Sequence, residues 1–256
     1  MSAGRIRHVP RARQSGLGLI ELMVVVLISL IMMAGLLALV FGSRQNFTAQ
    51  FQMAQLQDNE RLAMTLVTNV LQTGGYFYDP ALQKPAAAFP ASTANGTNFA
   101  GGQYVYGTGN YTGNDQIYVR YYVGPNNGSA SSDGTMDCTG ATNPSTSAPL
   151  MDVNYFYINA ATNQLMCQVN GGTAQPLVSG VTAMNILYGV ATAGTTSAVQ
   201  YVTAAALNGP SPPATWTQVV SAQVKLTFTT VATSAGANIM PMTVTLTRTI
   251  DLLNRV

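Results

Sequence analysis

The sequence predicts an α+β protein in which one long N-terminal α-helix precedes a domain of antiparallel β-strands. Two observations lead to this prediction. Residues 17–73 contain no proline and space their apolar residues as a helix does. From residue 115 onward, apolar and polar residues instead alternate with period two in short runs. The 256-residue chain is long enough for one membrane segment and one domain.

The first half of the predicted helix is apolar on all sides. Residues 22–41 carry no charge, and at about 1.5 Å per residue they could cross the hydrocarbon core of a bilayer. We therefore expect residues 17–41 to form a transmembrane segment surrounded by membrane lipid. Four arginines lie within the first 13 residues, which predicts a cytoplasmic N-terminus and an exported C-terminal domain.

The second half of the helix, residues 42–73, is expected to be amphipathic. Apolar residues recur there at three- and four-residue spacings, with Gln, Asn and charged residues between them. Gly74 and Gly75 supply the stop signal. The helix would thus stand in the membrane with its first half, while its second half packs on a globular β-rich head formed by residues 74–256.

Short runs with period-two alternation predict the strands of this head. They lie within residues 115–124, 153–160, 163–169, 181–190, 217–231 and 242–252. A turn is expected at residues 161–163. Residues 76–112 are interpreted as a long connection with one hairpin near 103–114, and residues 124–149 and 189–215 as loops.

Cys138 and Cys167 are the only cysteines, and both lie in the predicted exported part. In an oxidising compartment we expect them to form a disulfide, with two unpaired thiols as the alternative. The bond would close a loop of about 28 residues and stabilise the head by about 3 kcal/mol.

The residue types needed for catalysis are scarce in the predicted head. The only histidine is His8, which precedes the helix, and the only lysines are Lys84 and Lys225. Histidine-dependent nucleophiles and most histidine metal sites are thereby excluded from the head. No phosphate-binding loop is found either. We predict a protein that is not an enzyme and has no cofactor and no metal site.

Charged and aromatic residues of the head favour structural roles. Beyond the four leading arginines, seven basic residues face nine acidic ones, which argues against nucleic-acid binding. Arg120 and Arg248 are interpreted as solvated or aspartate-paired charges on strand faces. For three aspartates, turn formation is preferred over a calcium site. For six tyrosines, cross-strand pairing is preferred over a surface that binds a glycan or a partner protein. These residues are Asp133, Asp137, Asp152, Tyr104, Tyr106, Tyr111, Tyr118, Tyr121 and Tyr122.

Glu21 lies where a carboxylate is costly, four residues into the apolar run. A charge within a membrane segment costs about 2.5–3.5 kcal/mol, so such a residue is by default functional and has a partner. The surrounding stretch is SGLGLIELMVVVLISLIMMAGLL, residues 15–37. It closely resembles the class III signal of type IV prepilins.

The resemblance implies that residues 1–16 are a leader peptide. A prepilin peptidase would cleave after Gly16 and methylate the new N-terminal amine of Leu17. Glu21 would become the fifth mature residue and an assembly residue, paired with the N-terminal amine of a neighbouring subunit. The chain departs from the usual family pattern in having Leu17 in place of phenylalanine, and Gly18 in place of Thr or Ser.

Later segments resemble PilW-type minor pilins in the same order along the chain. They are FGSRQNFTAQFQMAQLQDNERLAMTLVTNVLQTGGY, NDQIYVRYYVG, DCTG, YFYINAATNQLMC, QPLVSGVTAMNILYGV and TVTLTRTIDLLNRV. The resemblance implies a type IV pilin-like fold and a minor pilin that primes assembly of a type IV pilus and is incorporated into it. Its implied partners are the prepilin peptidase, other minor pilins, the major pilin, the inner-membrane assembly platform and, as a further candidate, a tip adhesin.

The implied location is the inner membrane, with a single pass and a periplasmic head, and then the pilus at the cell surface. Two alternatives stay open at this point. A minor pseudopilin of a type II secretion system would share the signal and its physical chemistry. A signal-anchored periplasmic binding protein that never polymerises would fit the apolar segment but would leave Glu21 unexplained.

Overall fold

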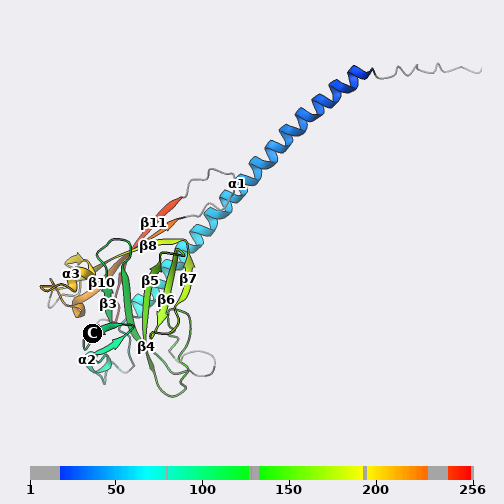
Figure 1. Ribbon diagram of the computed structural model, residues 1–256. Helices are drawn as coiled ribbons and strands as arrows, with labels where there is room; N and C mark the ends of the chain where they lie inside the picture. The colour runs from blue at the N-terminus through cyan, green and yellow to red at the C-terminus, as the bar shows by residue number, and fades with distance from the viewer. Residues whose placement is uncertain are drawn as a thin grey trace, which may run out of the picture. The chain divides into compact units, whose positions relative to one another are not determined.

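The computed structural model describes residues 18–78, 80–126, 128, 133–192, 195–229 and 242–254 (Figure 1). The chain forms two compact units, Met1–Phe51 and Gln52–Val256, which are described separately. The helices are α1 Leu19–Thr73, α2 Pro85–Ala88, α3 Ala204–Leu207 and the 3-10 helix η1 Trp216–Gln218. The strands are β1 Ser92–Ala94, β2 Thr97–Phe99, β3 Val105–Thr108, β4 Gln116–Val123, β5 Leu150–Asn159, β6 Gln164–Val169, β7 Gln175–Ser179, β8 Val181–Val190, β9 Gln200–Val202, β10 Val219–Thr229 and β11 Thr243–Asp251.

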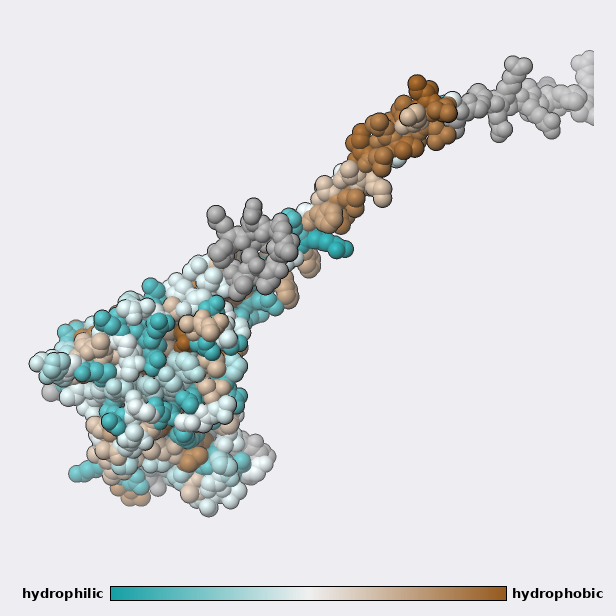
Figure 2. All heavy atoms as spheres, in the orientation of Figure 1, coloured by the Kyte–Doolittle hydropathy of each residue, from teal (hydrophilic) through white to brown (hydrophobic). Residues whose placement is uncertain are grey.

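In the first unit, α1 begins at Leu19, where the backbone N–H groups of Glu21 and Leu22 donate to the carbonyl of Gly18. The apolar side chains from Leu19 to Phe41 are exposed, and they form the brown surface in Figure 2. By length and composition this helix could cross a membrane, with a mean hydropathy of 3.0 over 18 residues. An exposed surface of this kind requires lipid or partner helices to cover it.

In the second unit, the last turns of α1 pack on two antiparallel sheets. The sheet orders are β3-β4-β5-β6-β7 and β11-β10-β8-β9. Side chains from the helix and from both sheets form one hydrophobic core. The helical contributors are Leu56, Ala63, Met64, Val67, Val70 and Leu71. The predicted α+β class, with a long helix packed on an antiparallel sheet domain, is therefore confirmed.

The alternating patterns identify the buried face of the main strands. On β10, Val220, Ala222, Val224, Leu226 and Phe228 are all buried. Lys225 lies on the opposite face, with its ammonium 5.9 Å from the centre of the Tyr111 ring. The predicted turn between β5 and β6 is also present, because Asn163 adopts the left-handed conformation (φ 51°) there.

Several short elements differ from the sequence prediction. Residues 76–112, interpreted as a connection with one hairpin, contain α2 and the β1–β2 hairpin in addition to β3. The loop expected at residues 189–215 contains β9 and α3, and β7 was not predicted. These elements are three to five residues long, too short for a periodic pattern, and tertiary contacts hold them in place.

Residues 84–103 fold over the outer face of the five-stranded sheet. Three alternate residues of β4 contact this segment. Tyr118 packs with Phe99 in one small apolar cluster, and Tyr122 donates from its hydroxyl to the carbonyl of Ala88 (2.9 Å). Between them lies Arg120, which is fully buried. A face that the sequence pattern left open to solvent is thus covered by a second layer.

Candidate functional site

The sequence-predicted assembly residue Glu21 lies in the first turn of α1, and its side chain is exposed. A carboxylate in this position interacts favourably with the partial positive charge of a helix N-terminus. It is the only acidic residue in an otherwise apolar stretch of exposed side chains. Gly16 and Leu17, the predicted cleavage position and new N-terminus, lie outside the described residues.

The structure joins Cys138 and Cys167 in a disulfide, with their Cα atoms 6.4 Å apart. Both cysteines are buried, and the bond fastens the 133–140 loop to β6. The backbone N–H of Cys138 also donates to the side-chain carbonyl of Asn154 on β5 (2.7 Å). The loop therefore has a covalent and a polar attachment to the five-stranded sheet.

The three aspartates considered for calcium have separate structural roles. The carboxylate of Asp133 accepts from the Thr135 backbone (3.0 Å), and that of Asp137 accepts from the Thr139 backbone (2.7 Å). Asp152 accepts from the side-chain amide of Asn170 (2.7 Å). Among the described residues, no group of three acidic, cysteine or histidine side chains could hold a metal ion. The turn-forming interpretation holds for Asp133 and Asp137.

Asp152 has a different environment because it is buried on the inner face of β5. Burial raises the pKa of its carboxyl, the hydrogen bond from Asn170 lowers it, and the nearby Asp137 raises it slightly, so that the resulting pKa is about 6. Between about pH 4 and 6, the folded protein therefore keeps a proton on Asp152 that the unfolded chain has already released. Stability is lost as the pH rises through this interval.

Replacing Asp152 by asparagine is expected to raise the free energy of unfolding at pH 7.5 by about 1–3 kcal/mol. The amide can still accept from Asn170 but carries no charge to desolvate. Because the native carboxyl is already neutral at pH 4, the gain should disappear there. Thermal unfolding of the full chain in detergent at both pH values measures the difference. An equal gain at pH 4 and 7.5 would contradict this account.

The structure corrects the expectation that Arg120 is a solvated or aspartate-paired charge on a strand face. Its guanidinium is fully buried and faces backbone carbonyls instead of a carboxylate. The acceptors are the carbonyls of Gln103, Pro90 (2.9 Å), Phe89 (3.3 Å) and Ala100 (3.0 Å), and the hydroxyl of Ser92 (3.0 Å). The rings of Phe89 and Phe99 lie 5.3 and 4.7 Å from its central carbon. Burial lowers its pKa to about 10, so it remains charged at neutral pH.

Most of the six tyrosines form core contacts or cross-strand aromatic contacts, as the preferred interpretation predicts, whereas Tyr111 lies between β3 and β4 with its ring near the Lys225 ammonium. Tyr104 and Tyr121 are core residues. Tyr118 on β4 stacks on its opposite neighbour Tyr155 on β5 at 4.3 Å, and Tyr155 stacks on Tyr157 at 4.8 Å. Because Tyr155 is stacked on both sides, neither face of its ring is open to a sugar.

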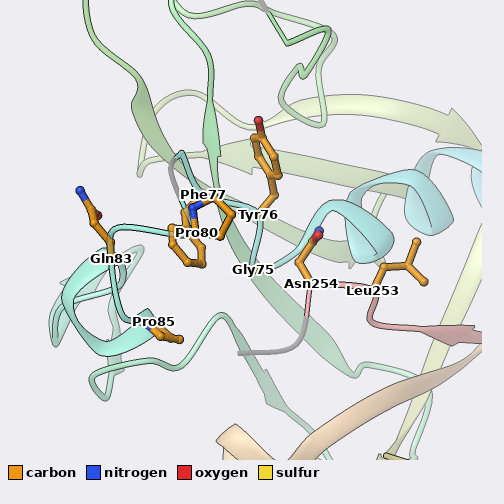
Figure 3. Close-up of a pocket in the computed structure, with 8 residues that line it drawn as sticks. All are labelled: Gly75, Tyr76, Phe77, Pro80, Gln83, Pro85, Leu253 and Asn254. Carbon is orange, nitrogen blue, oxygen red and sulfur yellow. The ribbon is translucent and has the colours of Figure 1, made fainter.

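A pocket of about 530 Å³ lies beside the C-terminal end of α1 (Figure 3). Its described lining is made of Gly75, Tyr76, Phe77, Pro80, Gln83, Pro85, Leu253 and Asn254. Asn254 donates from its side-chain amide to the carbonyls of Gln72 and Thr73 (both 3.2 Å), which caps the helix. Gly75 is required there, since it has φ 80° and a Cβ atom would lie 2.5 Å from the carbonyl oxygen of Asn254.

Another depression, of about 330 Å³, lies between α1 and β11. Gln57, Glu60, Arg61, Met64 and Thr65 line it from the helix, and Leu246, Thr247 and Arg248 line it from the strand. Arg248 lies opposite the core residue Val224, so its side chain is on the helix-facing side of the sheet while remaining exposed. Sequence reasoning interpreted Arg248 as a solvated or aspartate-paired strand charge but did not place it in the same depression as Arg61.

Comparisons with known proteins agree with the N-terminal signal and with the sheet domain. Residues 154–249 match the model of the type IV pilus-assembly protein W family, and residues 11–37 match the prokaryotic N-terminal methylation motif. Among solved structures, a type IV-like pilin from Thermus thermophilus is similar to this chain at 15% identity and a TM-score of 0.41. That similarity covers 78% of this chain and 98% of the pilin. No curated protein sequence matches the chain.

Proposed function

We propose, from the premise that this chain belongs to the PilW family of type IV pilus minor pilins, that it primes assembly of a type IV pilus and is incorporated into the filament. The observation that carries the proposal is the position of Glu21. It occupies the first turn of a helix whose following side chains are apolar and exposed. Such a helix is suited to anchor the chain in a membrane first and to pack among other helices afterwards.

In the proposed pathway, a prepilin peptidase removes residues 1–16 and methylates the amine of Leu17. The helix over residues 17–41 then holds the protein in the inner membrane, with its head in the periplasm. Assembly moves this segment from lipid into a bundle of pilin helices, together with other minor pilins, the major pilin and the assembly platform. The polymer forms through helix packing, and the chain carries out no chemical reaction itself.

Glu21 would fix the axial register of this packing. A carboxylate in lipid is costly without a partner, and a free α-amine is charged near neutral pH. When the Glu21 carboxylate meets the Leu17 amine of a neighbouring subunit, both charges are compensated in a medium of low dielectric constant. Wrong registers leave both charges unpaired, so the correct register is favoured.

Replacing Glu21 by glutamine is expected to leave membrane insertion and cleavage intact and to reduce incorporation into pili by about tenfold or more. The change keeps side-chain size and removes the charge. Immunoblots of the membrane fraction and of sheared pili measure both quantities. Asp58→Asn is the matched control, since it removes an exposed carboxylate from the same helix beyond the apolar segment.

Two results would contradict the proposal. Normal incorporation of the Glu21→Gln protein would refute the pairing of Glu21 with an amine. Intact mass and N-terminal sequencing of the wild-type protein should find a methylated Leu17 at its start. A chain that still begins at Met1 in cells with an active peptidase would instead identify a signal-anchored envelope protein. The match to the pilus-assembly family favours a pilus over a type II secretion system.

A further inference from the structure

The edges of the two larger sheets in the head differ in how they are closed. β3 is four residues long, and the side-chain amide of Asn208 donates to the carbonyl of Gly107 on it (2.9 Å). β7 contains Pro176, and Asn59 donates to the carbonyl of Ser179 (3.1 Å). β9 is three residues long. Short length, proline and side-chain cover are the usual protections of an edge strand.

The remaining edge strand, β11, has none of these three protections. It is nine residues long, contains no proline and pairs on one side with β10. The backbone N–H of Leu252 donates to the carbonyl of Val220, so in the β10–β11 register residue 252 and every second residue before it form the hydrogen-bonded pairs. Residues 244, 246, 248 and 250 therefore bond to β10, whereas residues 243, 245, 247 and 249 direct their N–H and C=O groups to the free edge.

The free edge carries a regular set of backbone groups on four threonines, Thr243, Thr245, Thr247 and Thr249. Within the part of the chain that the structure describes, none of these outward backbone groups has a hydrogen-bond partner. An edge of this length is a template on which an extended segment can add as a further strand. Side-chain alternation on β11 would impose apolar residues on one face of the added strand and hydroxyl residues on the other.

The charged residues on the helix-facing side of β11 determine what kind of segment can bind at its free edge. Arg248 and Arg61 line the depression beside β11, against the single carboxylate of Glu60. A strand added at this edge would bring one side chain next to Arg248, and a carboxylate there would form a charge-assisted hydrogen bond. Without such a partner, a charge on this side of an edge strand discourages association. Arg248 would thus reject most strands and accept an acidic one.

A second copy of this chain does not meet that requirement. In an antiparallel β11–β11 pair that keeps both faces matched, the residue opposite Arg248 is Val244, Leu246, Ile250 or another Arg248. Asp251, the only acidic residue of the strand, lies on the other face. Self-pairing therefore leaves the guanidinium beside an apolar side chain or a like charge.

We propose that the free edge of β11 binds an extended segment of a different pilus subunit, which adds as a fifth strand to the four-stranded sheet and places a carboxylate against Arg248. The inference rests on the proposed function, since the partner is a component of the same filament. It adds a head-to-head contact of defined geometry to the packing of the N-terminal helices.

Two pairs of full-length variants in the native cell test this contact. Thr247→Pro removes an outward N–H and blocks strand addition, while leaving every β10–β11 hydrogen bond in place. Thr247→Val keeps the N–H and the β-branched shape and is its matched control. We expect Thr247→Pro to lower the amount of protein in sheared pili by about tenfold, and Thr247→Val to change it by less than about twofold. Thermal unfolding of each purified variant verifies folding.

Arg248→Glu tests the charge and does not depend on a proline being tolerated. We expect about a tenfold loss from pili for Arg248→Glu and near-normal levels for Arg248→Lys. If Thr247→Pro and Arg248→Glu both reach wild-type levels in pili, strand addition at β11 is refuted. If only Arg248→Glu does, the acidic partner is refuted. If the wild-type protein is itself absent from pili, the proposed function fails, and this inference fails with it.

Discussion

Replacing Arg120 by methionine is expected to lower the free energy of unfolding by about 3–5 kcal/mol, the largest loss that we predict for a single substitution in this head. Methionine fills similar space but donates no hydrogen bonds. Four carbonyls and one hydroxyl of residues 89–103 would lose their common donor. A buried acceptor left unpaired costs about 1–3 kcal/mol, so part of this segment should detach and take up water.

The location of the damage distinguishes this mechanism from general destabilisation. Amide hydrogen exchange should accelerate first in residues 84–103, which Arg120 holds against β4, and later in β8 and β10. Arg248→Met is the matched control, since it removes an exposed arginine and should change stability by less than about 0.5 kcal/mol. Uniform acceleration throughout the head would contradict a role limited to this layer.

Arg120→Lys separates the charge from the geometry. Lysine keeps the positive charge but has three donors on one atom, whereas the guanidinium reaches its five acceptors with a planar fork. It would also lose most of the contact with the Phe89 and Phe99 rings. We expect lysine to recover less than half of the stability lost in Arg120→Met, as measured by denaturant unfolding. Full recovery would show that charge alone suffices.

Removing the disulfide is expected to have the second largest effect, a loss of about 3 kcal/mol for the double variant Cys138→Ala, Cys167→Ala. The bond closes a loop between positions 29 residues apart, and its loss returns conformational freedom mainly to the unfolded chain. The 133–140 loop should also loosen, because hydrogen bonds alone would then attach it, among them those from the Cys138 N–H to Asn154 and from the Tyr121 hydroxyl to the carbonyl of Met136.

Denaturant unfolding of the full chain in detergent, with and without reductant, measures this effect. Reduction should lower the midpoint of the wild-type protein to that of the double variant and should leave the double variant unchanged. The double variant is preferred over a single substitution because it leaves no free thiol. A wild-type midpoint that is insensitive to complete reduction would refute a stabilising role for this bond.

The sequence alone determined the features that depend on local pattern. The absence of proline between residues 17 and 73 and the glycine pair after it predict a single helix, and α1 spans Leu19–Thr73. Period-two alternation predicts the buried faces of β4 and β10 because a strand with one buried face displays its environment in its own residues. The placement of Glu21 in an apolar run likewise needs no tertiary information.

The tertiary structure decided what covers each outer face and which strand edge is left free. Arg120 looks like a solvated charge in β4 because the carbonyls that bury it belong to residues 89–103, which show no periodic pattern. Arg248 acquires its significance from Arg61, 187 positions earlier in the chain, and from the strand order that leaves β11 at an edge. Such relations arise from contacts between distant segments, and no local sequence pattern records them.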